Sequence, residues 1–421
     1  MATIKPFTAV LPRQDVAAQV AALPYDVYNR SEAKEETKKE PLSFLCIDRA
    51  ETQLSDEVDT YDPIVYQKAK ELYEDRKVKG IYQKDDKKSY FIYQLTMDGR
   101  AQTGVVALAS VDDYRNNVIK KHENTREEKE QDRIRHVDTL SAQTGPIFLA
   151  YRSNDTINTI VKKAQKEAPL YDFVAPDGVR HAVWRVADTE DASAMEQAFS
   201  EIGEVYIADG HHRAASAVKV SLKRREEYPD YTGEEEFNYF LSVLFPDDQL
   251  MIMDYNRSVK DLNGLSKEAF FEKIQEHFKM SELKEAAHPQ KKGQVTMFFE
   301  DKWYLLEADD ELLAITDPVA SLDVSILQNY LLGPVLGIKD PRTDDRIDFI
   351  GGIRGLSELE KRATTDMKVS FAMYPTSIHE LFSVADAGLL MPPKSTWFEP
   401  KLRSGIFIHE IEDACNKESV R

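Results

Sequence analysis

One stretch of the sequence decides the local fold: Val205-Tyr206-Ile207-Ala208-Asp209-Gly210-His211-His212-Arg213-Ala214-Ala215-Ser216-Ala217. Its first half is β-branched and aromatic and stops at Asp209-Gly210, and its second half is rich in alanine. Residues of these two kinds favour a strand and a helix respectively, and glycine favours the turn between them. The stretch therefore predicts a strand, a tight turn and a helix that runs to about Arg225.

The predicted turn carries groups that bind anions. A helix start offers unpaired backbone N–H groups and the positive end of a dipole. Gly210 lets a ligand approach the backbone, and Arg213 adds a planar guanidinium group that can donate two hydrogen bonds to a phosphate or carboxylate. We therefore interpret Gly210, His211, His212 and Arg213 as candidates for phosphate binding, and Asp209 as a functional carboxylate at the strand end.

An ordinary helix start is the alternative for this turn. In that case Asp209 caps the helix and the two histidines are solvated. Two adjacent histidines followed by an arginine are an unusual combination, so we favour the anion site. A metal site at this pair is disfavoured, because residues i and i+1 of a helix face different directions.

A second run of chemically active residues precedes this turn: Lys121-His122-Glu123-Asn124-Thr125-Arg126-Glu127-Glu128, followed by Asp132, Arg133, Arg135 and His136. Charge runs of this kind usually form a solvated helix face. The run also mixes the residue types that hold a metal–nucleotide complex. In that interpretation Glu123 and Asn124 supply oxygen ligands to the metal, and arginines contact phosphate.

Two further segments carry single candidates. Pro24-Tyr25-Asp26 forms a predicted loop in which Asp26 is either a base or metal ligand, or simply closes a turn. The segment Met391-Pro392-Pro393-Lys394-Ser395-Thr396-Trp397-Phe398 predicts a rigid loop. Lys394 either reaches a phosphate or substrate carboxylate from this loop or lies on the surface, and functional residues favour loops.

The pattern along the chain favours an α+β fold, with mixed sheets and packed helices. Asp62-Pro63 begins a clear helix that ends at Gly80, and Asp98-Gly99 joins two strands of a hairpin. Ser43 to Ile47 predicts a buried strand. Hairpins and helices alternate without regular βαβ units. The charged segment 226–236 places a boundary near residue 235, which divides the chain into an N-terminal region, 1–235, and a second α+β region, 236–421, that could close over the site.

Composition limits the classes of function. The chain has 421 residues and a formal net charge of −19, from 74 acidic and 55 basic residues. This balance disfavours DNA as a partner, because nucleic-acid affinity depends on neutralising phosphates. No apolar run has the length of a membrane helix, the N-terminus lacks a signal-peptide pattern, and there are two cysteines. We therefore expect a cytoplasmic protein without a membrane partner.

Five motifs resemble a known family when they are taken in order. They are Ile-Lys-Pro-Phe at 4–7, Pro-Tyr-Asp-Val at 24–27, His-Glu-Asn-Thr at 122–125, Ala-Asp-Gly-His-His-Arg at 208–213 and Met-Pro-Pro-Lys-Ser-Thr-Trp-Phe at 391–398. They resemble domain-of-unknown-function family 1015 of bacteria and archaea over nearly the whole chain. Members are often labelled SpoOJ/ParA/ParB/RepB family, because the Asp-Gly-His-His-Arg segment is distantly similar to the ParB and sulfiredoxin nucleotide-binding turn.

The resemblance implies a ParB/sulfiredoxin-like nucleotide-binding element and extends to the free-serine kinases. In those relatives the turn binds nucleotide phosphates and a carboxylate deprotonates serine. Carried over, Gly210, His211, His212 and Arg213 hold phosphates, Asp209 binds or orients Mg²⁺, and Glu123 with Asn124 resembles the ParB Glu-Asn pair that holds the metal. The base stays open between Asp26, Glu123 and Asp209.

Two main hypotheses follow. The first is a kinase that uses ATP or ADP with Mg²⁺ to phosphorylate a small hydroxylated metabolite such as free L-serine. The second is a ParB-like nucleotide-binding regulatory protein without metabolite kinase activity. A non-catalytic metabolic scaffold is a third possibility. The expected partners are therefore a small-molecule substrate and a nucleotide.

Overall fold

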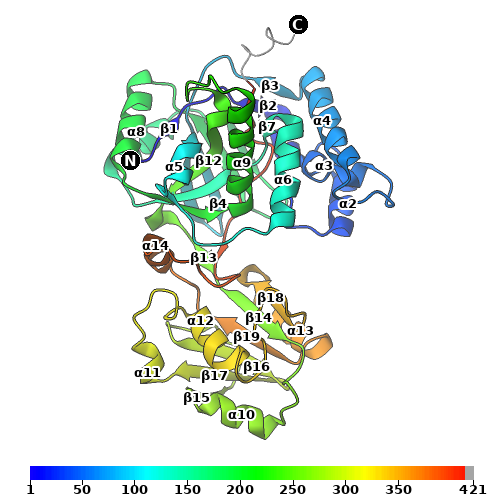
Figure 1. Ribbon diagram of the computed structural model, residues 1–421, viewed down its shortest axis with the longest axis vertical. Coiled ribbons are helices and arrows are strands. Elements are labelled where there is room, and N and C mark those ends of the chain that lie inside the picture. Colours follow the sequence, from blue (N-terminus) through cyan, green and yellow to red (C-terminus); the bar gives the residue numbers. More distant parts are fainter. Residues whose placement is uncertain (413–421) are drawn as a thin grey trace. The chain divides into compact units, whose positions relative to one another are not determined.

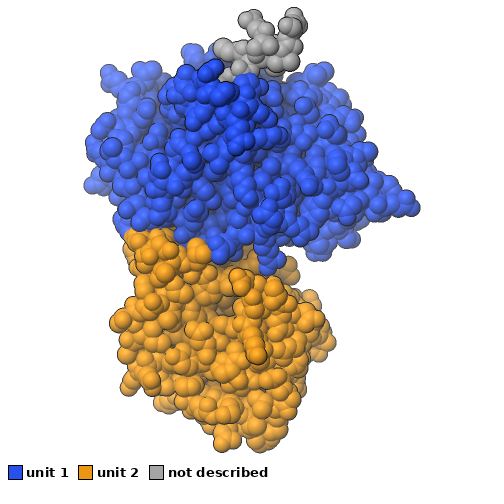
Figure 2. All heavy atoms as spheres, viewed as in Figure 1, with its two compact units in different colours: residues 1–250, 400–421 blue, residues 251–399 orange. Residues whose placement is uncertain are grey.

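The computed structural model describes residues 1–412, which form two compact units (Figures 1 and 2). Unit 1 contains residues 1–250 and the chain from Pro400 onward, and unit 2 contains Met251–Glu399. Each unit has its own sheet and its own helices. The predicted α+β class is confirmed.

Unit 1 is built on a nine-stranded mixed sheet (Figure 1). Its order is β6-β11-β8-β12-β5-β4-β10-β9, and β1 pairs with the end of β5. The neighbours β6–β11 and β8–β12 are parallel, and the other pairs are antiparallel. The strands are β1 (Ile4–Lys5), β4 (Phe91–Met97), β5 (Arg100–Ser110), β6 (Ile119–Lys120), β8 (Ile147–Tyr151), β9 (Tyr171–Val174), β10 (Arg180–Arg185), β11 (Val205–Asp209) and β12 (Tyr239–Pro246).

Two small two-stranded sheets complete the strands of unit 1. One pairs β2 (Val10–Pro12) with β3 (Tyr82–Lys84), and the other pairs β7 (Ala142–Gln143) with β21 (His409–Glu410). The second pairing returns the last described part of the chain to unit 1, where it lies among buried residues.

The helices of unit 1 hold the junction between β11 and α9. Helix α6 packs against α9, and α4 packs against α6 (Figure 1). An apolar core that includes Ile207 of β11 and Ala214 of α9 fixes the strand and the helix on either side of the turn. The helices are α1 (Ala17–Val20), α2 (Arg30–Lys39), α3 (Leu45–Asp48), α4 (Pro63–Val78), α5 (Val111–Arg115), α6 (Glu127–Leu140), α7 (Asp155–Ala164), α8 (Thr189–Glu201) and α9 (His211–Glu227).

Local sequence signals explain several of these elements. Asp62 accepts a hydrogen bond from the backbone N–H of Ile64, and Pro63 occupies the first turn of α4, as predicted. Asp98 and Gly99 both have positive φ, 51° and 77°, which is the backbone that a two-residue hairpin needs. The strand predicted at Ser43–Ile47 is wrong, because Leu45 and Ile47 lie in helix α3 and pack, together with the N-cap residue Phe44, into a second apolar core. Periodicity does not separate these two outcomes in so short an apolar run.

Unit 2 has an antiparallel six-stranded sheet of order β15-β17-β16-β19-β14-β18. A short pair, β13 (Ile252–Met253) with β20 (Trp397–Phe398), lies where the chain enters and leaves the unit. The other strands are β14 (Tyr255–Val259), β15 (Phe278–Leu283), β16 (Gln294–Phe299), β17 (Lys302–Ala308), β18 (Ile347–Gly351) and β19 (Val369–Met373), and the helices are α10 (Lys267–Gln275), α11 (Asp310–Leu313), α12 (Asp323–Leu327), α13 (Leu356–Thr365) and α14 (Ile378–Asp386).

The division of the structure differs from the boundary predicted near residue 235. Strand β12 follows that boundary and yet lies inside the large sheet, between β8 and β5. The chain leaves unit 1 only after Leu250 and returns at Pro400. Within residues 1–412, none of the helices has the length and apolar character that a bilayer crossing requires.

Candidate functional site

The β11–α9 junction has the predicted strand, turn and helix. Gly210 occupies the N-cap position with φ 93°, and α9 begins at His211. Because glycine has no side chain, no N-cap side chain competes for the first N–H groups of the helix. Asp209 does not cap the helix. Its Oδ1 accepts a hydrogen bond from the N–H of Gly210 at 2.8 Å, and its Oδ2 bonds to Lys401 Nζ at 2.8 Å.

The parallel pairing of β6 with β11 brings the second run of residues to this junction. Parallel strands end at the same edge of a sheet, so the residues after Lys120 lie beside those after Asp209. The rings of His122 and His211 meet edge to face, with centroids 4.5 Å apart. Glu123 Oε2 lies 4.0 Å from His211 Nδ1.

Charges converge on the Asp209 carboxylate. Burial alone would raise its pKa, but the ion pair with Lys401 and the nearby Arg213 outweigh that effect and hold the pKa at about 2. Lys401 comes from the returning segment after unit 2. Asp209 is therefore ionised at neutral pH and has little tendency to take up a proton.

Arg213 extends from the first turn of α9 toward a loop of the N-terminal part. Its guanidinium lies 5.5 Å from the centre of the Tyr25 ring, and Arg133 lies 4.0 Å from the same ring. Gly145 leaves the space that Arg213 occupies, because a Cβ there would lie 2.8 Å from Arg213 Nη1. Tyr25 is thus flanked by two guanidinium groups, which is a cation–π arrangement.

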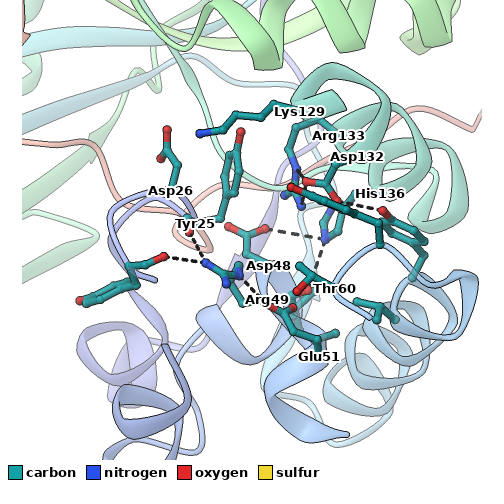
Figure 3. Close-up of a pocket in the computed structure, with 16 residues that line it drawn as sticks. Tyr25, Asp26, Asp48, Arg49, Glu51, Thr60, Lys129, Asp132, Arg133 and His136 are labelled. Atoms are coloured by element: carbon teal, nitrogen blue, oxygen red, sulfur yellow. Dashed lines mark hydrogen bonds and ion pairs between the residues drawn. The ribbon is translucent and has the colours of Figure 1, made fainter. Parts of the chain in front are cut away.

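Tyr25 and Asp26 line a cavity of about 150 Å³ in unit 1 (Figure 3). Arg49 donates hydrogen bonds to the carbonyls of Tyr25 and Tyr28 and fixes this loop. A smaller cavity of about 30 Å³ shares part of the same wall and reaches Arg213. The two cavities have three residues in common, namely Asp48, Arg133 and His136.

Most charged groups in this cavity are paired. Arg133 bonds to Asp132, and Arg49 bonds to Glu51. His136 Nε2 lies 3.8 Å from Asp48 Oδ1. Burial and the nearby Arg133 lower the pKa of His136 to about 4 against the effect of Asp48. The imidazole is therefore neutral at physiological pH. Asp26 is exposed at the cavity, and Lys129 also lines it (Figure 3).

The structure brings most of the candidate residues into unit 1 in two groups. Asp209, Gly210, His211 and Arg213 share the junction with Glu123, whereas Asp26 lies on the cavity that Arg213 approaches. His212 Nε2 accepts a hydrogen bond from the N–H of Arg126, so it is half-buried rather than fully solvated. Asn124 is exposed next to Glu123.

Lys394 belongs to unit 2. It is exposed and adopts φ 59°, and its carbonyl accepts a hydrogen bond from Arg257. The role that the sequence suggests for it, contact with a phosphate or carboxylate, stays a prediction.

Sequence reasoning did not select four residues that the structure places in these groups: His122, Lys401, Asp48 and His136. His122 and His136 lie inside the charge run. His122 is next to Glu123, and His136 is on the buried face of α6, so the sequence could have indicated both as ionisable residues of the site. Buried residues of that helix include Asp132, Arg133 and His136, so the run is not a solvated face alone. Asp48 and Lys401 carry no local signal.

Comparison with solved structures gives distant similarities. The chain is similar to SbnI with C-terminal truncation from Staphylococcus aureus, at 12% identity and a TM-score of 0.39, over 75% of this chain and 92% of that chain. It is also similar to a free serine kinase in complex with AMP, at 14% identity and a TM-score of 0.34, over 71% of this chain and 91% of that one.

A conserved hypothetical protein from Pyrococcus furiosus is similar at 14% identity and a TM-score of 0.34, over 72% of this chain and 94% of that chain. None of the curated proteins matches the chain. At the level of sequence, the family described as "Protein of unknown function (DUF1015)" matches residues 4–325, which is most of the chain. This protein belongs to that family.

Proposed function

We propose that this protein is a nucleotide-dependent phosphotransferase that acts on a small hydroxylated metabolite, with free L-serine as the first substrate to test. One observation carries the proposal. Arg213 starts at the N-terminal turn of α9, a place suited to phosphate, and its guanidinium lies against Tyr25 of the cavity. A phosphate group and a small substrate could therefore meet within reach of one side chain.

Phosphoryl transfer suits this arrangement, because the reaction needs positioning and charge stabilisation more than covalent chemistry. In our proposal the backbone of Gly210, the two histidines and Arg213 hold the phosphates of ATP or ADP. His211 is neutral, so it would donate or accept hydrogen bonds rather than contribute charge. Arg213 supplies a positive charge that contacts the transferred phosphoryl group.

Asp26 is the base that this proposal assigns. A base near a substrate hydroxyl works best when its proton affinity is not too low. Asp209 is held ionised by its ion pair with Lys401, which disfavours it as a base. Glu123 lies beside His211 at the junction, whereas Asp26 lies exposed on the cavity where the substrate would bind. Asp209 then acts by fixing Lys401 and the turn.

Mg²⁺ enters the proposal as part of the metal–nucleotide substrate. Mg²⁺ prefers oxygen ligands and takes most of them from nucleotide phosphates and water. Glu123 and Asn124 are the side chains that the sequence suggests for it. Glu123 lies beside the imidazoles of His122 and His211, which are not ligands that Mg²⁺ prefers. We therefore assign to Asn124 alone a direct contact with the nucleotide-bound ion.

The test is product formation. The full chain is incubated with Mg²⁺, L-serine and either ATP or ADP, and phosphoserine is followed by mass spectrometry. We expect product, and we expect Arg213→Ala to lower its rate by about 100-fold, the usual cost of removing one charge-stabilising group. Arg115→Ala, which removes a half-exposed arginine of α5, is the matched control and should leave the rate unchanged.

Other outcomes decide between the functions. Nucleotide binding without transfer to any of a panel of hydroxy amino acids would favour the ParB-like regulatory protein. A nucleotide present at 100 times its dissociation constant should stabilise the fold by about 2.7 kcal/mol. A melting curve that no nucleotide shifts would contradict both functions.

A further inference from the structure

Two buried imidazoles at the β6–β11 edge have ring nitrogens without partners. The side chains of His122 and His211 are 2% and 6% exposed. Among the residues that the structure describes, His122 Nδ1 and His211 Nε2 have no hydrogen-bond partner. A buried polar atom that lacks a partner costs about 1–3 kcal/mol, so native proteins rarely leave one unsatisfied. Two such atoms on touching rings indicate a ligand.

A carboxylate completes the group. One ring nitrogen of each histidine and one oxygen of Glu123 all lie within 4.8 Å of one another, and the His211 nitrogen nearest to Glu123 is Nδ1 rather than the unpartnered Nε2. A metal ion with bonds of about 2.0–2.2 Å keeps its ligand atoms roughly 3.3 Å apart. The three side chains therefore need to move inward by about 1 Å or a little more, which rotamer adjustments can supply.

The protonation of the histidines suits ligation, since a metal binds the neutral ring. Both rings are buried, and burial favours the neutral imidazole over the charged one. His122 also makes a hydrogen bond to the backbone of Ile207. Because Nδ1 has no partner, Nε2 is the donor in that bond, and the lone pair is on Nδ1. Such a bond fixes the tautomer of ligating histidines.

We propose that His122, Glu123 and His211 bind a divalent transition-metal ion of the Zn²⁺ class. Two imidazole nitrogens and one carboxylate are a donor set typical of such ions and not of Mg²⁺, which prefers oxygen. Three protein ligands leave at least one coordination position open for an anionic oxygen of a substrate. This inference goes beyond the phosphotransferase proposal, because the site requires neither a nucleotide nor serine.

The chain order explains how the site arises from residues that are far apart in the sequence. His122 and Glu123 follow the end of β6, and His211 follows the end of β11. The parallel register, in which Ile119 pairs with Val205 and Lys120 with Tyr206, brings both ends to one edge. His212, the sequence neighbour of His211, faces Arg126 instead and is not in the group.

The experiment measures metal binding by the full chain without nucleotide. The chelator-treated protein is titrated with Zn²⁺ by calorimetry, and Co²⁺ is used in parallel as a probe whose visible absorption reports imidazole ligation. We expect one Zn²⁺ per chain. Glu123→Gln, His122→Gln and His211→Gln should each weaken Zn²⁺ binding by at least about 10-fold and change the Co²⁺ spectrum.

Two matched variants serve as controls. Glu128→Gln removes an exposed carboxylate of α6 near the same loop, and His212→Gln removes the neighbouring histidine but keeps a hydrogen-bond acceptor for Arg126. Both should bind Zn²⁺ as the unchanged protein does. Glu123 is only half-buried, so Glu123→Gln decides the question if a histidine variant fails to fold.

Lack of saturable Zn²⁺ binding, or binding that the Glu123→Gln variant retains in full, would overturn the proposal. Failure of serine phosphorylation with intact Zn²⁺ binding would contradict only the phosphotransferase. Phosphorylation by a protein that binds no Zn²⁺ would contradict only the metal site.

Discussion

A residue of unit 1 can affect the site by leaving room for a neighbouring side chain as well as by its own functional group. Gly145 is an example. Its φ is not positive, so its backbone accepts other residues, yet a Cβ there would lie 2.8 Å from Arg213 Nη1 and 2.9 Å from Ser404 Oγ. The two nearest atoms belong to the end of the long Arg213 side chain, which can shift to make room for the extra methyl. The position of the Arg213 guanidinium then has to change.

Gly145→Ala should therefore resemble a partial loss of Arg213. We expect nucleotide affinity to fall by roughly 10-fold, about 1.4 kcal/mol, because a charged hydrogen-bonding group is displaced rather than removed. The melting temperature should change little. Titration calorimetry with ATP and ADP measures the first quantity and a thermal scan the second. Gly203→Ala, at a glycine with open space around it, is the control. Unchanged affinity in Gly145→Ala would contradict the assignment of Arg213 to phosphate.

At the scale of elements, the site depends on strands and segments that end side by side. The residues that follow the two-residue strand β6 and the returning segment after Pro400 both contribute to the site at the β11–α9 junction. The returning segment is held by a cluster on Glu410, which bonds to Lys77 of α4 and Lys84 of β3, both at 2.9 Å. Tyr73 adds a hydrogen bond to the same carboxylate.

Glu410 gives the attachment of this segment a defined pH dependence. Burial would raise its pKa, but Lys77 and Lys84 outweigh that effect and hold the pKa at about 2. A folded-state pKa below the unfolded value of about 4.5 stabilises the fold above pH 4.5, and this stabilisation is lost as the pH falls toward 2. The side chain is 19% exposed, and the shift corresponds to roughly 3 kcal/mol.

Glu410→Gln should thus be less stable than the unchanged protein at pH 7 by roughly that amount, and the difference should shrink between pH 4.5 and 2. Urea unfolding over this range measures it. Glu74→Gln, which removes a half-exposed partner of the same Lys77, should cost less than about 1 kcal/mol. A difference for Glu410→Gln that stays constant with pH would contradict the role of this carboxylate.

How far the sequence predicts these elements depends on how local their signals are. The strand, turn and helix around Gly210 follow from adjacent residues, and so do the cap at Asp62 and the hairpin at Asp98. The residues of the anion site can be recognised from the sequence because they are also adjacent along the chain. The neighbours of the turn cannot be recognised in this way, because β6 has two residues and pairs with a strand that lies more than 80 positions later.

The Asp209–Lys401 pair and the cavity show the same limit. Lys401 is 192 residues away from Asp209 in the sequence, and no pattern near either residue links them. Asp48 escaped prediction because its short apolar run has no period that separates a helix from a strand. Its contacts, a hydrogen bond from Thr144 and the approach of His136, come from other elements. Contacts of this kind are set by packing and not by local propensity.

At the scale of the whole molecule, unit 2 is an insertion within unit 1. The chain leaves after Leu250 and returns at Pro400, and the N–H of Glu399 bonds to the carbonyl of Met251 at 3.4 Å. The ends of the inserted unit are therefore adjacent. Each unit has its own apolar core, including Ile350, Leu359 and Ala372 in unit 2. Domains with close termini and separate cores usually fold independently.

We therefore expect unit 1 to survive removal of unit 2. A protein in which a short Gly-Ser linker joins Leu250 to Pro400 should melt cooperatively and bind Zn²⁺ as the full chain does. Removal of 236–399, starting at the boundary that composition suggests, deletes β12 from the centre of the sheet and should abolish cooperative melting. Calorimetric scans of both proteins decide the matter. Equal loss of folding in the two would contradict the independence of unit 1.

The insertion of unit 2 also determines the stage of translation at which the site can become complete. A ribosome releases residues in order, and domains tend to fold as they emerge. Asp209 is made long before its counter-ion Lys401, and the whole of unit 2 is translated between them. A nascent chain thus carries the junction without the Asp209–Lys401 ion pair until unit 2 has been translated and Lys401 has been added. Premature termination within unit 2 would leave the Asp209 carboxylate without Lys401, so completion of the site requires translation of the whole of unit 2.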